Sequence, residues 1–505
     1  MINIETKHDM NWQNLCYTAY GDKPVTISPG LLQSVDQGRL QFLKLIEDGH
    51  SCYGVTTGLG QLIGVEFSES EKLELSKTIL RARAAAIGKA VPKPVARAAM
   101  FIRLVNFLSA LDGVSAKLCS FIIERLNDDF TPWIPEIGHG MAGDAIAHTH
   151  CFQTLVGEGF VLDKDGNKLS AHTALKQRRI KPYELATKEG AALLNGVAFT
   201  PAYALHAHRE TTHTLQLATL VAAATIEAIA APKDSVDNQL KSLTSETGTQ
   251  TTITILNQYL KASDIKPYKL QSPISVRVIP QVHGALTDAL EALALRIDHC
   301  LRDFTDNPVM VLEDGRGRFL SNGGFHNQHL VNQVEHVAIA LSHVGALSER
   351  RLHRLLDPIQ TGLTKQLANR PGLDAGLVVA HKATVDIVAR LRMTAQPLSL
   401  LTSETSAGQE DYMSLAVPCI QRIFELCTLT RMLLAYELMT ATVALDQRVE
   451  SASTTVRRLH KLIRQQVAPL QQDRPPGPDA ETIFEMMSLP IFDHLLATIN
   501  PNRWP

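Results

Sequence analysis

The sequence predicts a mainly α fold, a bundle of long helices packed against one another. Apolar residues recur at three- and four-residue spacing through residues 330–347 and again through residues 423–445. Stripes of this length are typical of amphipathic helices whose apolar faces are buried together. Alternation of apolar and polar residues, which favours β-strands, is confined to residues 251–255 and 275–282.

Loops and helices can be placed in order along the chain. Glycine-rich loops are expected at residues 54–64 and 135–143, and a helix with proline in its first turn is expected at residues 94–111. Clusters of glycine, asparagine and proline mark later loops at 306–308, 321–324 and 474–479. We expect one continuous protein in three parts: a loop-rich N-terminal part carrying the site (1–200), a central long-helix bundle (201–460) and a C-terminal cap (461–505).

Composition excludes several classes of function. The net charge of −2 over 505 residues favours neither a nucleic-acid partner nor an anionic membrane. Seven scattered cysteines without C-x-x-C pairs favour free thiols in a reducing cytoplasm. The apolar run 215–231 contains Gln216 and Glu227, which indicates a buried helix rather than a membrane span. The polar N-terminus lacks the layout of a signal peptide, so we expect a cytoplasmic protein.

The segment 138–144, which reads Gly-His-Gly-Met-Ala-Gly-Asp after Pro-Glu, is the most informative part of the chain. Its frame resembles the cofactor segment of the histidine and phenylalanine ammonia-lyase family. In that family an Ala-Ser-Gly triplet cyclises and the serine loses water, which gives the electrophile methylidene-imidazolone (MIO). Met141, Ala142 and Gly143 stand at the triplet here. Alanine has no β-leaving group, so we expect no MIO and no other cofactor.

A second match to this family is the glycine-rich stretch that begins at Tyr53 and includes Gly60. It resembles the family's Y-G-V-x-T-G-x-G, which implies that Tyr53 is a general base on a mobile loop and that Gly60 lies against the substrate. A free tyrosine has a pKa of about 10, so such a base needs nearby positive charge or strong hydrogen bonds. The alternative is an ordinary tyrosine in a lid or turn.

Two further motifs imply substrate contacts. Residues 189–196 resemble E-G-L-A-L-L-N-G, so Asn195 is expected to bind substrate; alternatively, it closes a helix end. Residues 271–277 resemble Q-D-x-Y-S-L-R, which implies that Gln271 contacts the substrate and that Arg277 clamps its carboxylate. The alternative for Arg277 is a surface position. Ile274 replaces the family's tyrosine and is expected to leave an apolar wall.

Residues 405–414 resemble T-S-x-x-Q-E-D-x-x-S, which implies that Glu410 faces the substrate amine or acts as an acid or base. A helix-capping pattern explains the same residues. Phe325, in a segment that resembles x-F-H, is expected to line the site or simply to pack as a core aromatic.

Two basic residues, Arg83 and His139, leave alternatives open. Arg83 stands where the family's side chains meet the substrate ring, so it either adds a second cation to the pocket or points to solvent. His139 is a possible improvised acid or base, or a loop histidine with its hydrogen bonds satisfied. His148 and His150 lie two residues apart, which points them to different faces of a helix, so we expect no metal site.

The resemblance runs from about residue 28 to residue 479. It implies a fold of the ammonia-lyase and fumarase-aspartase type, assembled as a homotetramer whose sites are shared between subunits. Tyr53, Arg277 and Glu410 would then come from different chains.

The favoured function is an MIO-independent, lyase-type enzyme. Tyr53 would move a proton on a small, carboxylate-bearing substrate derived from an amino acid, in elimination, addition, isomerisation or cyclisation. The alternative is a catalytically silent homologue that binds a small anion or a protein partner. An ordinary aromatic amino acid ammonia-lyase is disfavoured, because its chemistry needs the missing electrophile.

Overall fold

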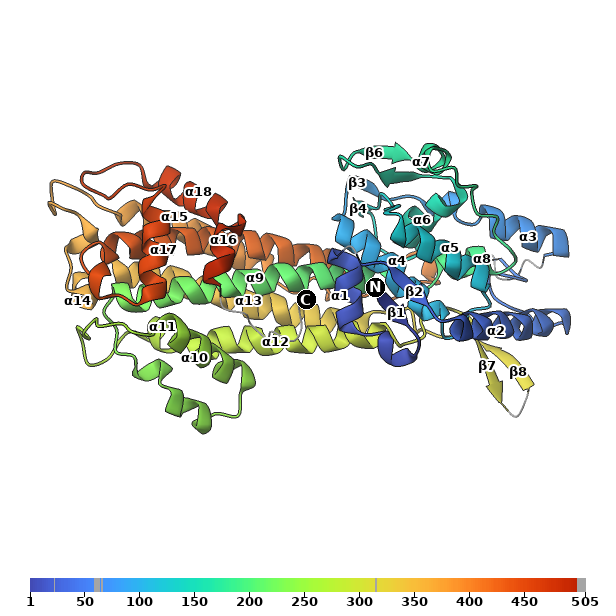
Figure 1. The fold of residues 1–505 in the computed structure, drawn as a ribbon, viewed down its shortest axis with the longest axis horizontal. Coiled ribbons are helices and arrows are strands. Elements are labelled where there is room, and N and C mark those ends of the chain that lie inside the picture. Colours follow the sequence, from blue (N-terminus) through green and yellow to red (C-terminus); the bar gives the residue numbers. More distant parts are fainter. Residues whose placement is uncertain (22, 59–63, 65–66, 314–315, 497–505) are drawn as a thin grey trace.

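The computed structural model describes residues 1–21, 23–58, 64, 67–313 and 316–496. It is an elongated molecule in which long helices run side by side along the long axis (Figure 1). The four longest are α9 (Phe199–Ala228), α12 (Ile279–Cys300), α13 (Gln328–Leu355) and α16 (Ala416–Leu445). The stripes predicted at 330–347 and 423–445 are confirmed as the apolar faces of α13 and α16.

The N-terminal part sits at one end of this bundle (Figure 1). The predicted helix at 94–111 is α4, which packs against α9 with nearly all its residues buried. Apart from α4 (Lys93–Phe107), the helices of this part are α1 (Trp12–Tyr20), α2 (Pro29–Glu47), α3 (Glu69–Thr78), α5 (Ala116–Asn127), α6 (Ala145–Phe152), α7 (Ala171–Gln177) and α8 (Glu189–Leu194).

The β-structure of the described residues consists of four two-stranded sheets. One is parallel, with Ile2 opposite Val25, and the others are antiparallel. The pairs are β1 (Ile2–Ile4) with β2 (Val25–Ile27), β3 (Ile87–Ala90) with β4 (Pro135–Ile137), β5 (Phe160–Leu162) with β6 (Lys168–Ser170), and β7 (Val309–Glu313) with β8 (Arg316–Leu320).

The opposite end of the bundle carries shorter helices that cover the long ones (Figure 1). They are α10 (Thr247–Tyr259), α11 (Ile274–Arg277), α14 (Pro358–Thr361), α15 (Val378–Thr394), α17 (Thr454–Arg464) and α18 (Pro476–Met486). The expectation of strands at 251–255 and 275–282 was therefore wrong, since both stretches are helical. The predicted boundary between residues 460 and 461 was also misplaced, because it falls inside α17.

The core is continuous from one end of the molecule to the other. The alanine-rich stretch of α9 is almost wholly buried, as predicted for the run 215–231. No helix within the described ranges combines the length and apolar character that crossing a membrane requires. All seven cysteines are buried free thiols, as the sequence predicted.

Candidate active site

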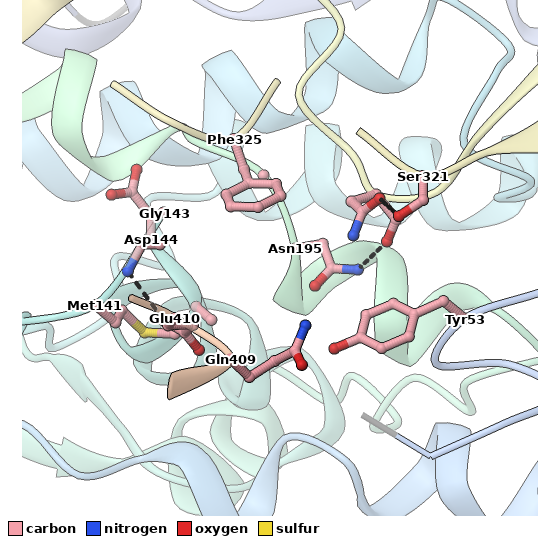
Figure 2. A pocket seen from close by; sticks show the side chains of 13 residues that line it. Tyr53, Met141, Gly143, Asp144, Asn195, Ser321, Phe325, Gln409 and Glu410 are labelled. Atoms are coloured by element: carbon pink, nitrogen blue, oxygen red, sulfur yellow. Dashed lines mark hydrogen bonds between the residues drawn. The ribbon is translucent and has the colours of Figure 1, made fainter. Parts of the chain in front are cut away.

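A cavity of about 200 Å³ opens where the N-terminal part meets the bundle. The residues around it come from six separate segments of the chain (Figure 2). Most of the residues expected at the site line this one cavity: Tyr53, Met141, Ala142, Gly143, Asn195, Phe325 and Glu410. The fold therefore gathers motifs that are up to 357 positions apart in the sequence, from Tyr53 to Glu410.

The segment Met141-Ala142-Gly143 forms one wall, between the end of β4 and the start of α6. Gly143 has a φ of +85°, a conformation that favours glycine. A Cβ atom there would lie 3.4 Å from the carbonyl oxygen of Gly196 and from Cβ of Phe325. Glycine thus lets the segment turn closely past the opposite walls.

Asp144 fixes the end of this segment to the start of α9. Its carboxylate accepts a hydrogen bond of 2.8 Å from the amide of Thr200 and another from the Thr200 hydroxyl. Its own amide donates to the carbonyl oxygen of Gly196 at 3.2 Å. Burial raises the pKa of Asp144 to about 6, although the hydrogen bonds from Thr200 work in the opposite direction. Asp144 therefore holds the wall in place.

Figure 2 shows the hydroxyl of Tyr53 pointing toward the middle of the cavity, with the Asn195 carboxamide beside it. Asn195 directly follows α8, so the predicted helix end is confirmed. Its Nδ2 donates a hydrogen bond of 2.8 Å to the carbonyl oxygen of Asn307. The helix-end and site-lining interpretations of Asn195 therefore hold together.

A buried group of charges supports the wall that carries Asn307. Lys188 pairs with Asp306 at 2.7 Å, and both side chains are almost fully buried. Arg103 lies 3.8 Å from Asp306 and 3.7 Å from Asp112. Burial raises the pKa of Asp112 to about 6, while the charge of Arg103 lowers it. Lys188 and Arg103 thus balance the charges of Asp306 and Asp112 next to the cavity wall.

Glu410 reaches the cavity from the loop that precedes α16. Its Oε2 accepts a hydrogen bond of 3.1 Å from the amide of Ala142, and its Oε1 accepts one of 3.3 Å from the Ser406 hydroxyl. The expectation that Tyr53 and Glu410 come from different chains was wrong, because both line the cavity of one chain. The loop folds back along the chain's own N-terminal part and brings them together.

Arg83 lies in a short 3₁₀ helix (Arg81–Arg83) and is half-buried. It does not line the cavity; its Nη1 donates a hydrogen bond of 2.8 Å to the carbonyl oxygen of Ile79. Burial lowers the pKa of Arg83, whereas its attraction to the ionised form of Tyr53 raises it. Arg83 is therefore close enough to the candidate base to act on its charge.

The histidines near the segment make structural contacts. His139 is buried outside the cavity, with Nε2 donating to the Pro135 carbonyl at 2.7 Å and its ring 5.0 Å from that of Phe199. His139 is not among the residues that line the cavity, so its role as an acid or base stays a prediction.

His148 is fully buried: Nδ1 donates to the carbonyls of Leu194 and Asn195, and Nε2 accepts from the amide of Ala198. Burial lowers its pKa to about 3 and lowers that of His150 to about 4. Over the described residues, no group of three or more His, Cys, Asp or Glu side chains is arranged to hold a metal.

Arg277, Gln271 and Ile274 lie at the other end of the bundle, in and just before α11 (Figure 1). Arg277 is half-buried, and its buried Nε has no hydrogen-bond partner within the described part of the chain. Ile274 is 60% exposed. Within one chain these residues do not reach the cavity. Gly60 lies outside the described residues.

Four polar residues that line the cavity were not predicted as site residues, namely Asp144, Asn307, Ser321 and Gln409. Gln409 stands next to Glu410 in the motif that was recognised, so the motif itself carried that signal. Asn307 lies in a stretch that resembles the family's T-D-N-P but was not assigned a role, and Ser321 was identified only as a loop residue. Their approach depends on the hydrogen bond of 3.4 Å from the Ser321 hydroxyl to Oδ1 of Asn307, which local sequence does not reveal.

Comparison with known proteins identifies the family to which this chain belongs. The family model of aromatic amino acid lyases matches residues 10–465. The chain belongs to the aromatic amino acid lyase family. It is 30% identical to the probable histidine ammonia-lyase of Thermoplasma acidophilum over 468 residues, which cover 92% of this chain and 93% of that protein. A histidine ammonia-lyase of Symbiobacterium thermophilum is also 30% identical, over 470 residues and 92% of each chain.

Solved structures of lyase-family proteins have the same fold. The tyrosine aminomutase of Streptomyces globisporus is 25% identical, with a TM-score of 0.87 and 98% of each chain covered. The ergothioneine-degrading enzyme ergothionase of Treponema denticola superposes with a TM-score of 0.92 over 98% of this chain and 100% of that one, at 22% identity. Family membership supports a lyase-type enzyme that acts on an amino acid-derived substrate.

Proposed function

We propose that this lyase-family protein moves a proton on a small, carboxylate-bearing substrate without the family's internal electrophile. The observation that carries the proposal is the position of Ala142. It lies in the cavity wall at the family's serine position, bonded through its amide to Glu410 and opposite Tyr53. The methyl side chain has no leaving group, so the residues present do not fit MIO.

Tyr53 is the base in this proposal. Its hydroxyl points into the cavity (Figure 2), and Arg83 interacts with it electrostatically, which supplies the nearby positive charge that a tyrosine base requires. The phenolate removes a proton from a carbon of the substrate. The electrons of the broken C–H bond form a double bond as the leaving group on the next carbon departs with its bonding pair.

Glu410 and Asn195 position the rest of the substrate. The Glu410 carboxyl group lines the cavity beside Ala142, where it can hold a cationic amine or pass a proton to the leaving group. Without an electrophile to activate an amine, the favoured leaving group is one that departs as a stable anion or after protonation by Glu410.

The carboxylate clamp comes from a second copy of the chain. No lysine or arginine is among the described residues that line the cavity, so a substrate carboxylate has no cationic partner there within one chain. Arg277 has a buried, unpartnered Nε at the opposite end of the bundle, and exposed Leu270 and Ile274 flank it. A homotetramer in which one chain's α11 reaches another chain's cavity supplies both the cation and a cover for these apolar side chains.

Hydrogen exchange in heavy water tests the proposal. The protein is incubated with pools of amino acids, hydroxy acids and dicarboxylates, and mass spectrometry detects deuterium uptake and new products. Enzyme-dependent exchange into one compound is the expected result and identifies the substrate class. Tight binding of such a compound without any exchange would favour the silent, anion-binding homologue instead.

A further inference from the structure

A cluster of basic side chains lies at the C-terminal end of α13, where this helix packs against α15. Arg350, His353 and Arg354 are three and four residues apart, so they share one face of the helix. The cluster is remote from the cavity, because 25 residues of helix at about 1.5 Å each separate its centre from the start of α13. Nothing in the proposed reaction uses it.

Two imidazole rings form the centre of this cluster. The rings of His353 on α13 and His381 on α15 stack with their centroids 4.1 Å apart and their planes within 13° of parallel. Nη2 of Arg354 lies 2.9 Å from Nδ1 of His353. A guanidinium can only donate, so Nδ1 accepts and the ring hydrogen of neutral His353 is on Nε2.

Glu349 holds the other side of the stack. This buried carboxylate, 1% exposed, accepts from Nε2 of His381 at 2.7 Å through Oε1 and pairs with Nε of Arg350 at 3.0 Å through Oε2. Oε1 is thus hydrogen-bonded to His381, whereas Oε2 makes the ion pair with Arg350 but no hydrogen bond within the described residues. More than half of the Arg350 side chain remains exposed.

The cluster carries more positive charge than its one acid balances. The charged groups that act on His353 are His381, Arg354, Glu349 and Arg350, of which only Glu349 is acidic. Burial is the largest cause that lowers the pKa of His353, and the charges of His381 and Arg354 lower it further. The lowered pKa favours the neutral form of the ring beside these cations. A bound anion would relieve that repulsion and engage the outward N–H groups.

We infer that Arg350, His353, Arg354 and His381 form a binding site for a small phosphate-type oxyanion. Guanidinium groups match the geometry of phosphate oxygens and bind them with paired, charge-assisted hydrogen bonds. Nε2–H of His353 provides one further donor, since its Nδ1 is occupied by Arg354, and His381 holds the His353 ring by stacking. Glu349 is the one acid in this group, and its carboxylate is buried against His381 and Arg350 rather than exposed to a ligand.

Isothermal titration calorimetry with inorganic phosphate at neutral pH tests this site on the full-length protein. We expect one saturable site per chain in the wild type and at least a tenfold weaker affinity in Arg354→Met. The matched control is Arg390→Met, which removes an exposed arginine paired with Asp386 further along α15. This control retains wild-type affinity.

A second variant keeps the inference testable if Arg354→Met fails to fold. His353→Gln removes the stacked ring and also weakens phosphate binding at least tenfold, with the unfolding temperature checked for each protein. Absence of a saturable signal in the wild type overturns the inference, as does equal affinity in wild type and His353→Gln. Acetate that binds as tightly as phosphate contradicts the phosphate class.

Discussion

The amide of Ala142 donates a hydrogen bond of 3.1 Å to Oε2 of Glu410, across 268 positions of sequence. This contact joins the segment that builds the electrophile in related lyases to the loop that carries the candidate acid. It places a methyl group, rather than a reactive side chain, beside the carboxylate. The proposed function follows from this pairing, with Tyr53 on the opposite wall.

The intact mass of the chain should equal the mass calculated from its sequence. MIO formation removes water from the triplet, and none of the side chains of Met141, Ala142 and Gly143 has a hydroxyl group to lose. Mass spectrometry of the intact protein, followed by a digest covering residues 138–144, measures this directly. A peptide lighter by one or more water molecules would show that the segment cyclises in some other way.

Tyr53→Phe and Arg277→Met should each abolish hydrogen exchange into the substrate when tested alone. Tetramers that contain both variant chains should recover part of this exchange. In a mixed tetramer, some cavities combine an intact Tyr53 with an intact Arg277 from the neighbouring chain. The matched control pairs Tyr53→Phe with Asn195→Ala. These two residues line the cavity of one chain, so that mixture stays inactive. Failure of the first mixture, with tetramers present, would place the carboxylate clamp elsewhere.

Lys188→Met should destabilise the protein strongly, by about 3–5 kcal/mol, because it removes the nearer of the two cations that pair with the buried carboxylate of Asp306 and leaves only Arg103, 3.8 Å away. The control is Lys93→Met, which breaks an exposed pair with Asp129 and should cost at most about 1 kcal/mol. Denaturant unfolding measures both. Equal stability of the two variants would mean that the buried pair adds nothing to the wall behind the cavity.

Acidification should destabilise the protein through His148. Its pKa is about 3 in the folded state, below the value of about 6.5 for an unfolded chain, so the unfolded state binds the proton more readily. Stability is complete above pH 6.5 and falls toward pH 3 by about 1.4 kcal/mol per pH unit from this group.

His148→Gln should therefore show a shallower loss of stability between pH 6.5 and 4 than the wild type. Urea unfolding at several pH values gives the two slopes. Asp144, whose raised pKa has the opposite effect, is present in both proteins and largely cancels in the comparison. His172→Gln, at an exposed position, is the control and should keep the wild-type slope. Identical slopes for His148→Gln and wild type would contradict the assignment.

The helical architecture could be predicted because its signal is periodic and local. The stripes of α13 and α16 repeat over many turns, and burial of their apolar faces is the interaction that orders the bundle. The strands predicted at residues 251–255 and 275–282 are helical in the structure. Both stretches are rich in β-branched residues, which favour strands. In α10, burial of Thr252, Ile253 and Leu256 against the neighbouring α12 outweighs that preference.

The candidate site was predictable only where a motif carried it. Tyr53, Asn195 and Glu410 were found by motif, whereas the buried pair of Lys188 and Asp306 resembles solvated charge in the sequence. Burial of such charges depends on contacts between segments 118 positions apart, which no local pattern encodes. For the same reason, the sequence left open whether Arg83 faces the pocket or solvent.

Deuterium exchange by wild type and Tyr53→Phe on the same substrate tests the central claim most directly. We expect at least a hundredfold slower exchange in Tyr53→Phe, within the range that general base catalysis contributes, with the unfolding temperature unchanged. Tyr436→Phe, on α16 away from the cavity, should exchange at the wild-type rate. Wild-type exchange in Tyr53→Phe would show that another group moves the proton, and would contradict the proposed function of this site.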